Sequence, residues 1–216
     1  MTVNQQALPY EQVSKLIEDS QSFALAECIC KKEKGLLDKR CDKPLEVCLA
    51  FASIPGVMEN FKHWGKVITK EEAFDVLKKS EEAGLVHLTV NWQTGHSFIC
   101  NCCGCCCGVL RGINEFGITD AINSNYYAQI DPELCEACGI CAEERCQVGA
   151  IEEHDNVYRV IRERCIGCGL CVSTCPTEAI HLYRKQPEEL VPTPQDENAW
   201  LEERARERGV DYHAFK

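Results

Sequence analysis

The chain has 216 residues, 18 of them cysteine, and a formal net charge of −11 at pH 7. No basic stripe suits phosphate binding and no run of about 18 apolar residues occurs, so we expect neither a nucleic-acid partner nor direct membrane insertion. No secretory pattern precedes Tyr10, and the cysteines fall into groups with metal-ligand spacing. We therefore expect a cytoplasmic protein, with any membrane association peripheral and through a partner.

The first 120 residues predict a mainly helical module. Val13, Leu16 and Ile17 recur at helical spacing, and Thr69-Lys-Glu-Glu72 has the pattern of a capping box. The predicted elements are a helix over residues 10–27, a short helix over 44–52, a helix from residue 69 to a stop at Gly84, a strand over 85–90, and a short helix through 110–113.

Ten cysteines lie in this module and form two groups along the sequence. The first group is Cys28, Cys30, Cys41 and Cys48, at intervals that no short zinc ribbon uses. The second group occupies one dense stretch, in which Cys100, Cys103 and Cys106 are three residues apart, Cys102 and Cys105 interleave, and Cys107 follows. One continuous strand or helix cannot present all six cysteines of this stretch to one metal.

A cysteine phrase then occurs twice, thirty residues apart. Its members are Cys135, Cys138 and Cys141, then Cys165, Cys168 and Cys171, closed by Cys146 and Cys175 respectively. Residues 127–130 and 157–161 resemble strands that enter each cysteine loop, so we expect two short β-hairpins and short helices. Four residues separate Cys141 from Cys146, where three separate Cys171 from Cys175. This extra residue predicts a local bulge near residues 143–144, with the cysteine ligand retained.

The end of the chain predicts a tether and a helix. Residues 186–194 are acidic and rich in proline, which indicates an extended segment. Residues 196–208 predict a charged helix with Trp200 and Leu201 as apolar anchors. This helix is either a solvated tail or an element that folds over the body or docks to a partner.

Residues 126–183 resemble the bacterial dicluster [4Fe-4S] ferredoxins, in which the fourth cysteine of each phrase ligates the other cluster. The resemblance implies cluster A on Cys135, Cys138, Cys141 and Cys175, and cluster B on Cys165, Cys168, Cys171 and Cys146. Two zinc sites are the alternative, but the duplicated phrase and Pro176 after Cys175 favour iron and sulfide. The motifs Cys28-Ile-Cys30-Lys31 and Asn123-Ser-Asn-Tyr-Tyr127 are similar to those of a poorly characterised family of dicluster-domain proteins from anaerobes.

Three hypotheses compete for the upstream cysteines. One or two additional [4Fe-4S] clusters are favoured, with ligands from Cys28, Cys30, Cys41, Cys48, Cys100, Cys103 and Cys106, and with Cys102 and Cys105 as alternatives. A zinc or structural site is the second hypothesis, and an unusual cluster or catalytic thiol site is the third. Cys107 is interpreted as a free buried cysteine.

Together these features predict an α+β chain with three parts. Residues 1–120 form the cysteine-rich module, 121–185 the ferredoxin-like dicluster domain, and 186–216 the tether and helical tail. The predicted function is one-electron transfer, as a carrier or as a subunit of an anaerobic oxidoreductase whose other subunits are its partners. The alternatives are a redox enzyme with its site at residues 100–107 and a cluster-based redox sensor. No nucleotide fingerprint, haem motif or nucleophile elbow is present.

Overall fold

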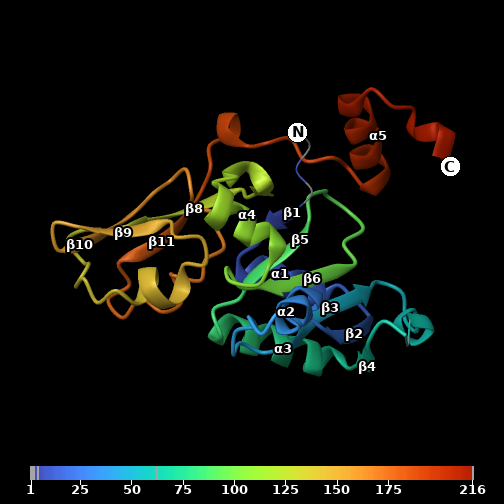
Figure 1. Ribbon diagram of the computed structural model, residues 1–216, viewed down its shortest axis with the longest axis horizontal. Helices are drawn as coiled ribbons and strands as arrows, with labels where there is room; N and C mark the ends of the chain where they lie inside the picture. The colour runs from blue at the N-terminus through green and yellow to red at the C-terminus, as the bar shows by residue number, and fades with distance from the viewer. Residues whose placement is uncertain (1–2, 4, 62, 216) are drawn as a thin grey trace.

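The computed structural model describes residues 3, 5–61 and 63–215. Within these residues, seven strands form one sheet in the order β4-β2-β3-β6-β5-β1-β7, and two further pairs, β9 with β10 and β8 with β11, form small separate sheets (Figure 1). The fold is therefore mixed α and β, as the sequence predicts.

The element bounds are as follows. The large sheet contains β1 Gln5–Ala7, β2 Ser22–Glu27, β3 Glu46–Ala52, β4 Lys66–Ile68, β5 Val86–Val90, β6 Phe98–Cys102 and β7 Ile122–Asn123. The small sheets contain β8 Tyr126–Ile130, β9 Ile151–His154, β10 Val157–Val160 and β11 Ile180–Arg184. The α-helices are α1 Tyr10–Glu18, α2 Ile29–Gly35, α3 Lys70–Glu82, α4 Gly108–Phe116 and α5 Glu197–Arg208.

The prediction that the first module is mainly helical is wrong. The segment 44–52 contains strand β3 rather than a helix, and the predicted helix over 10–27 is the short helix α1 followed by strand β2. In β3, Val47, Leu49 and Phe51 are buried while the residues between them are half-buried. Both faces of this strand carry apolar residues, so its period of two is hard to distinguish from a helix pattern.

The capping box at the start of α3 is confirmed. The Glu72 backbone N–H donates to Thr69 Oγ1 at 3.1 Å, and the Thr69 N–H donates to Glu72 Oε2 at 2.8 Å. Gly84 follows the helix with a φ of +67°, a conformation that glycine adopts at no steric cost. The predicted strand after it is β5, and the predicted short helix near residue 110 is α4.

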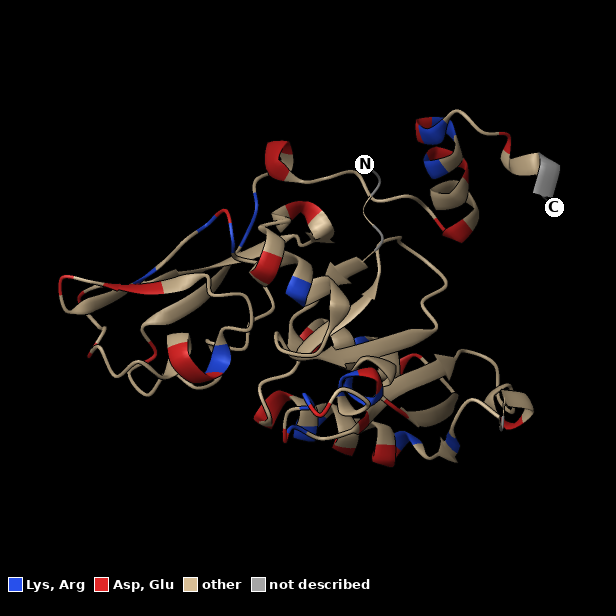
Figure 2. Ribbon diagram, viewed as in Figure 1, with Lys and Arg blue, Asp and Glu red and all other residues tan. Residues whose placement is uncertain are grey.

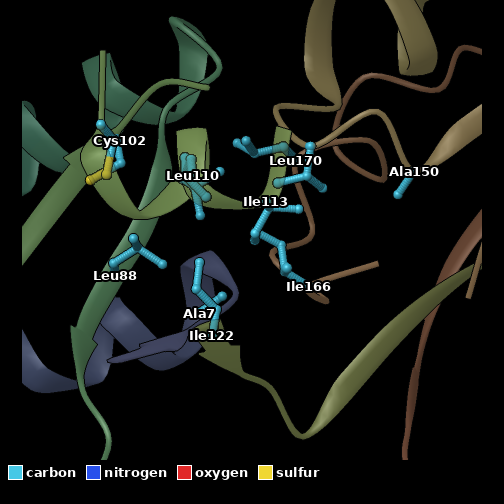
Figure 3. Close-up of a cluster of buried hydrophobic side chains, with 12 residues drawn as sticks. Ala7, Leu88, Cys102, Leu110, Ile113, Ile122, Ala150, Ile166 and Leu170 are labelled. Carbon is cyan, nitrogen blue, oxygen red and sulfur yellow. The ribbon is translucent and has the colours of Figure 1, made fainter. Parts of the chain in front are cut away.

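Helices pack on both faces of the large sheet. On one face, α1 and α3 contribute Val13, Ile17, Ala73 and Leu77 to a core with strands β2, β3, β4 and β6. On the other, Leu110 and Ile113 of α4 pack on β1, β5, β6 and β7. Val148, Ala150, Ile166 and Leu170 of the segment 120–182 complete this second core (Figure 3). The front and back parts of the chain thus share one apolar core.

Residues 126–184 are framed by a strand pair and a hairpin. Strand β8 pairs antiparallel with β11, which joins the two ends of this segment, and only β9 and β10 form a true hairpin. In the hairpin turn, Asp155 and Asn156 both have positive φ, at 54° and 61°, which is the backbone of a type I′ turn. One of the two predicted hairpins is therefore a pairing of distant strands.

The extra residue before Cys146 is accommodated in a π-helical turn, Cys141–Arg145. The Cys146 N–H donates to the carbonyl of Cys141 at 3.0 Å, five residues back. This wider turn holds one residue more than a 3₁₀ or α turn. It is the physical form of the bulge that the duplication predicts near residues 143–144.

The end of the chain crosses the molecule and packs on the end of the β5–β6 hairpin (Figure 1). The backbone N–H groups of Gln93 and Thr94 donate to Pro194 and Gln195 carbonyls at 2.9 and 3.1 Å. Trp200 of α5 packs on Trp92, with ring centroids 6.0 Å apart, and only 8% of its surface is exposed. The tail is therefore packed on the body. No helix in the described part of the chain is long and apolar enough to cross a membrane.

Candidate metal centres

Two cavities in the segment 126–184 are each lined by four cysteines. The first is lined by Cys135, Cys138, Cys141 and Cys175, together with Tyr158, Ile130 and Ile180. The second is lined by Cys146, Cys165, Cys168 and Cys171, together with Ala150, Ile166 and Leu170. Each cavity combines three cysteines of one phrase with the closing cysteine of the other. We call them cavity A and cavity B.

Backbone amides point at the cysteine sulfurs in matching places. Ala150 N–H donates to Cys146 Sγ at 3.1 Å, and Ala179 N–H donates to Cys175 Sγ at 3.3 Å. At the entry strands, the N–H of Ala128 donates to Cys165 Sγ at 3.4 Å and that of Tyr158 to Cys135 Sγ at 3.5 Å. Such donors stabilise thiolates and tune the potential of iron–sulfur groups.

The duplication extends to the backbone angles. Three pairs of equivalent positions have positive φ: Ala137 (52°) with Gly167 (59°), Gly139 (79°) with Gly169 (84°), and Gly149 (58°) with Glu178 (54°). At Gly167 the reason is also steric, because a Cβ would lie 2.2 Å from the carbonyl oxygen of Tyr126. The same loop conformation therefore recurs around both cavities, although glycine does not occupy every position with positive φ.

Several of these thiols have raised pKa values because they are buried. Burial raises the pKa of Cys168 to about 12, and burial with the nearby Cys138 and Cys135 raises the pKa of Cys141 to about 11. Burial acts in the same direction on Cys175, but hydrogen bonds from Thr177 and backbone amides outweigh it and lower the pKa. Buried thiols ionise readily only when a cation joins them, so the donor set is suited to a metal-containing group.

Arg145, in the π-helical turn, joins cavity B to the large sheet. Its side chain is 7% exposed, and its guanidinium donates to the carbonyls of Leu170 (2.9 Å), Glu82 (3.1 Å) and Glu81 (2.8 Å). The last two carbonyls end helix α3, where a cation is favourable. The Glu81 carboxylate lies 3.4 Å from Arg145 Nη2 and accepts from Ser173 Oγ at 2.7 Å.

A second set of thiols lies on the large sheet, on the face covered by α4. Six thiols lie close enough in series to shift one another's pKa values: Cys28, Cys30, Cys107, Cys102, Cys100 and Cys48. Strand pairing explains the end of this series, because Leu49 lies opposite Ile99 and the next pair in the antiparallel register is Cys48 and Cys100. Buried Lys31, 1% exposed, lies one residue beyond Cys30 and donates to the Pro44 carbonyl at 2.6 Å. We call the six cysteines the six-thiol set.

The remaining four upstream cysteines form a compact group. The sulfurs of Cys41, Cys103, Cys105 and Cys106 all lie within 4.8 Å of one another. The structure therefore divides the upstream thiols differently from their order in the sequence. Cys41 lies with cysteines of the second sequence group, and Cys100 lies with cysteines of the first. Cys107 contacts Cys30 and Cys102 and is not an isolated thiol.

The sequence analysis did not single out Arg145 as a contact between the two parts of the chain. The extra residue before Cys146 could have indicated it, because this residue lies in the turn that places Arg145 against helix α3. The spacing of residues does not single out Gly104 either, whereas a buried, hydrogen-bonded role is the ordinary expectation for a lone histidine such as His87. His87 is fully buried, and its ring contacts Asn101 Oδ1 at 2.6 Å and Glu81 Oε2 at 3.2 Å.

Comparison with known proteins agrees with this geometry. The family model described as a 4Fe-4S dicluster domain matches residues 120–182. An uncharacterized ferredoxin of Methanocaldococcus jannaschii is 33% identical over 90 residues, which cover 41% of this chain and 53% of that protein. One subunit of an ion-translocating oxidoreductase complex of Methanosarcina acetivorans is 40% identical over 48 residues, 22% of this chain and 18% of that protein.

The chain thus spans about half of one curated relative and under a fifth of the other. The family model and the ferredoxin concern iron–sulfur proteins, and the second relative is part of an oxidoreductase. By this similarity, residues 120–182 are a 4Fe-4S dicluster domain.

Proposed function

We propose that this chain relays single electrons through two [4Fe-4S] clusters, one in each cavity. Cys135, Cys138, Cys141 and Cys175 hold cluster A, and Cys146, Cys165, Cys168 and Cys171 hold cluster B. A bound [4Fe-4S] cluster supplies a site that gains and loses one electron at little structural cost. The protein supplies thiolates, amide donors to their sulfurs and an apolar surround.

One observation carries this proposal: each cavity is lined by three cysteines of one phrase and the closing cysteine of the other. Zinc sites built from adjacent CxxC pairs need no such exchange. Cys141 and Cys171 also belong to one apolar cluster with Tyr158 and Ile180, which supports two adjacent redox sites.

Paired substitutions test the exchange of ligands. Cys135→Ala with Cys175→Ala removes two ligands from cavity A alone, so about four iron and four sulfide should be lost from the parent's content. Cys135→Ala with Cys146→Ala removes one ligand from each cavity and should perturb the electron paramagnetic resonance spectra of both clusters. If the second pair spares one cluster and the first pair damages both, the exchange of ligands is wrong.

We also propose that the six-thiol set holds one further [4Fe-4S] cluster. Cys100, Cys102 and Cys107 pack on the same core as Cys146, Cys165 and Cys168 of cavity B. Leu110 and Leu170 occupy that core, so a dry apolar path joins the two sites (Figure 3). Buried Lys31 offsets part of the negative charge that such a group adds. In anaerobically purified protein, about twelve sulfides per chain support this cluster and about eight exclude it.

An acidic surface near cavity A is the proposed docking site for a redox partner. Cys138 is exposed, and Glu143, Glu152, Glu153 and Asp155 lie on the π-helical turn and the β9–β10 hairpin (Figure 2). A partner with a basic surface fits this charge. The similarity to one subunit of an ion-translocating oxidoreductase complex suggests that the partner is another subunit of an oxidoreductase.

The docking proposal is tested by electron transfer to a basic c-type cytochrome. Glu152→Lys with Glu153→Lys should slow the transfer at low salt and flatten its dependence on ionic strength. The matched control is Glu202→Lys with Glu203→Lys on α5, far along the chain from cavity A. Equal rates for the two double variants would place the docking site elsewhere.

A second function, reduction of a small apolar acceptor, is favoured by one pocket. It has a volume of about 410 Å³, is open to solvent, and is lined by Cys48 of the six-thiol set together with Met58, Phe61, Trp64 and Phe98. Two electrons from the clusters and two protons from water would convert a bound quinone to the hydroquinone. Reduced protein mixed with a naphthoquinone tests this: Trp64→Ala should raise KM several-fold, and turnover that is insensitive to Trp64 excludes the pocket.

A further inference from the structure

The compact group of four thiols is built from two separate segments. Cys41 lies in the loop between α2 and β3, while Cys103, Cys105 and Cys106 lie in the turn between β6 and α4. The Cys41 sulfur is 3.7 Å from those of Cys103 and Cys106, and the Cys105 and Cys106 sulfurs are 3.9 Å apart. Segments 62 residues apart in sequence thus bring four soft ligands to one point.

These spacings suit one metal ion rather than a cubane. Thiolates bound tetrahedrally to a single ion at about 2.3 Å stand about 3.8 Å from one another. In a [4Fe-4S] cluster each thiolate binds a different iron, so the four sulfurs stand farther apart. The molecule offers its own comparison: among the described residues, the cysteines of cavities A and B form no group as close as this one.

The surroundings suit a closed site. Cys103 and Cys106 are 1% and 2% exposed and pack with Val47 and Leu85, whereas Cys105 is exposed at the surface. Four protein ligands leave no coordination position for a substrate, which is typical of structural metal sites. Tetrahedral sulfur ligation selects zinc or iron among the common metals.

The turn that carries three of these ligands also rests on the dicluster domain. The Gly104 N–H donates to Gln147 Oε1 at 3.0 Å, and a Cβ at Gly104 would lie 2.2 Å from the Gln147 carbonyl oxygen. Asn114 Nδ2 donates to both the Gly104 and the Gln147 carbonyls, at 3.3 and 3.0 Å. Gln147 directly follows Cys146, which lines cavity B.

We propose that Cys41, Cys103, Cys105 and Cys106 bind one tetrahedral thiophilic divalent ion, Zn²⁺ or Fe²⁺, which fixes the Gly104 turn against Gln147. The single-ion site replaces a second upstream cubane. This site does not depend on the proposed function. Only the link from Gln147 through Cys146 to cavity B rests on the assignment of Cys146 to cluster B.

The test measures zinc, iron and sulfide in the whole chain purified without oxygen. In [4Fe-4S] clusters the iron content equals the sulfide content. The parent protein should contain one further metal ion per chain, either as one zinc or as one iron in excess of the sulfide. Cys105→Ser and Cys106→Ser should each lose this ion and keep the parent's sulfide. Cys138→Ser, a variant of cavity A, is the matched control and should keep the single ion.

X-ray absorption of the parent protein gives an answer that does not depend on how the variants fold. Zinc in the site should show one shell of four sulfurs at about 2.3 Å with no metal neighbour. If the site takes iron, chain produced with added Co²⁺ should give a high-spin Co²⁺ signal that Cys106→Ser abolishes and Cys138→Ser retains.

Loss of sulfide together with iron in Cys105→Ser would show a cluster at these thiols and overturn the proposal. A parent with no metal beyond its sulfide-matched iron would overturn it as well. If instead the single ion is present while sulfide is absent, the proposed function fails and the single-ion site stands.

Discussion

Replacing Arg145 with methionine tests how strongly the dicluster domain is fixed to the large sheet. The methionine keeps most of the aliphatic volume of the arginine side chain but removes its donors. The carbonyls of Glu81, Glu82 and Leu170 then lose a charged partner, and the Glu81 carboxylate loses the guanidinium 3.4 Å away. The perturbation acts at the junction between the two parts of the chain, beside cavity B.

The expected cost follows from burial. Removing one partner of a buried charged pair costs about 3–5 kcal/mol, since the other groups stay desolvated and unpaired. Arg145 has a side chain only 7% exposed and Glu81 one only 16% exposed, so solvent cannot replace the lost bonds without opening the junction. We expect the free energy of unfolding to fall by about 3–5 kcal/mol.

Anaerobic urea unfolding followed by tryptophan fluorescence measures this change, with an expected midpoint shift of about 1–2 M. The control is Arg111→Met, which removes a solvent-exposed pair with Glu115 four residues along α4 and should leave the midpoint nearly unchanged. Equal midpoints for the two variants would refute the reasoning, because burial would then not distinguish the two arginines.

Three further predictions concern the cavity loops, the tail and acid stability. Gly167→Ala places a Cβ 2.2 Å from the Tyr126 carbonyl oxygen and should lower the free energy of unfolding by at least about 2 kcal/mol. Ala137→Gly at the equivalent position should raise the free energy of unfolding by about 0.5–1 kcal/mol, because Ala137 has a positive φ. Equal shifts in thermal midpoint for the two variants would contradict this. Trp200→Ala should release α5, so that trypsin cleaves the tail faster while cluster content stays constant, and Glu202→Ala should not; loss of clusters in the first variant would show a wider role. Burial raises the pKa of Glu81, but hydrogen bonds from His87 and Ser173 outweigh it and hold the pKa below its usual value. The ionised carboxylate therefore stabilises the fold fully above a pH of about 4.3, and this stabilisation is lost as the pH falls through the folded-state pKa. Glu81→Gln should flatten the acid side of the curve of stability against pH, and parallel curves for parent and variant would exclude this role.

The sequence predicts the local features of this fold better than its distant pairings. The capping box at Thr69 and the spacing of the cysteine phrases depend on residues a few positions apart, and both produce the expected local structure. Strand β3 was mistaken for a helix because both of its faces carry apolar residues, which removes the polar alternation that marks a half-buried strand.

The grouping of the upstream thiols could not be predicted for a different reason. Cys48 lies beside Cys100 because β3 pairs with β6 in one register, and Cys41 reaches Cys103 because the loop after α2 returns to the β6–α4 turn. Neither relation leaves a trace in the spacing of residues along the chain. By contrast, the one-residue difference between the two phrases was visible, and only its use by Arg145 required the structure.

Strand β1 pairs only with strands that are distant from it in sequence. Its three residues pair with β5 and with β7, whose last residues are 90 and 123, so both partners of β1 lie far along the chain from it. Long-range pairings of this kind form slowly, because the chain between them must first be brought together. Ala7 of β1 closes the core on which Cys102 and Cys107 pack. The core beneath these two thiols is therefore complete only when β1, β5 and β7 have come together.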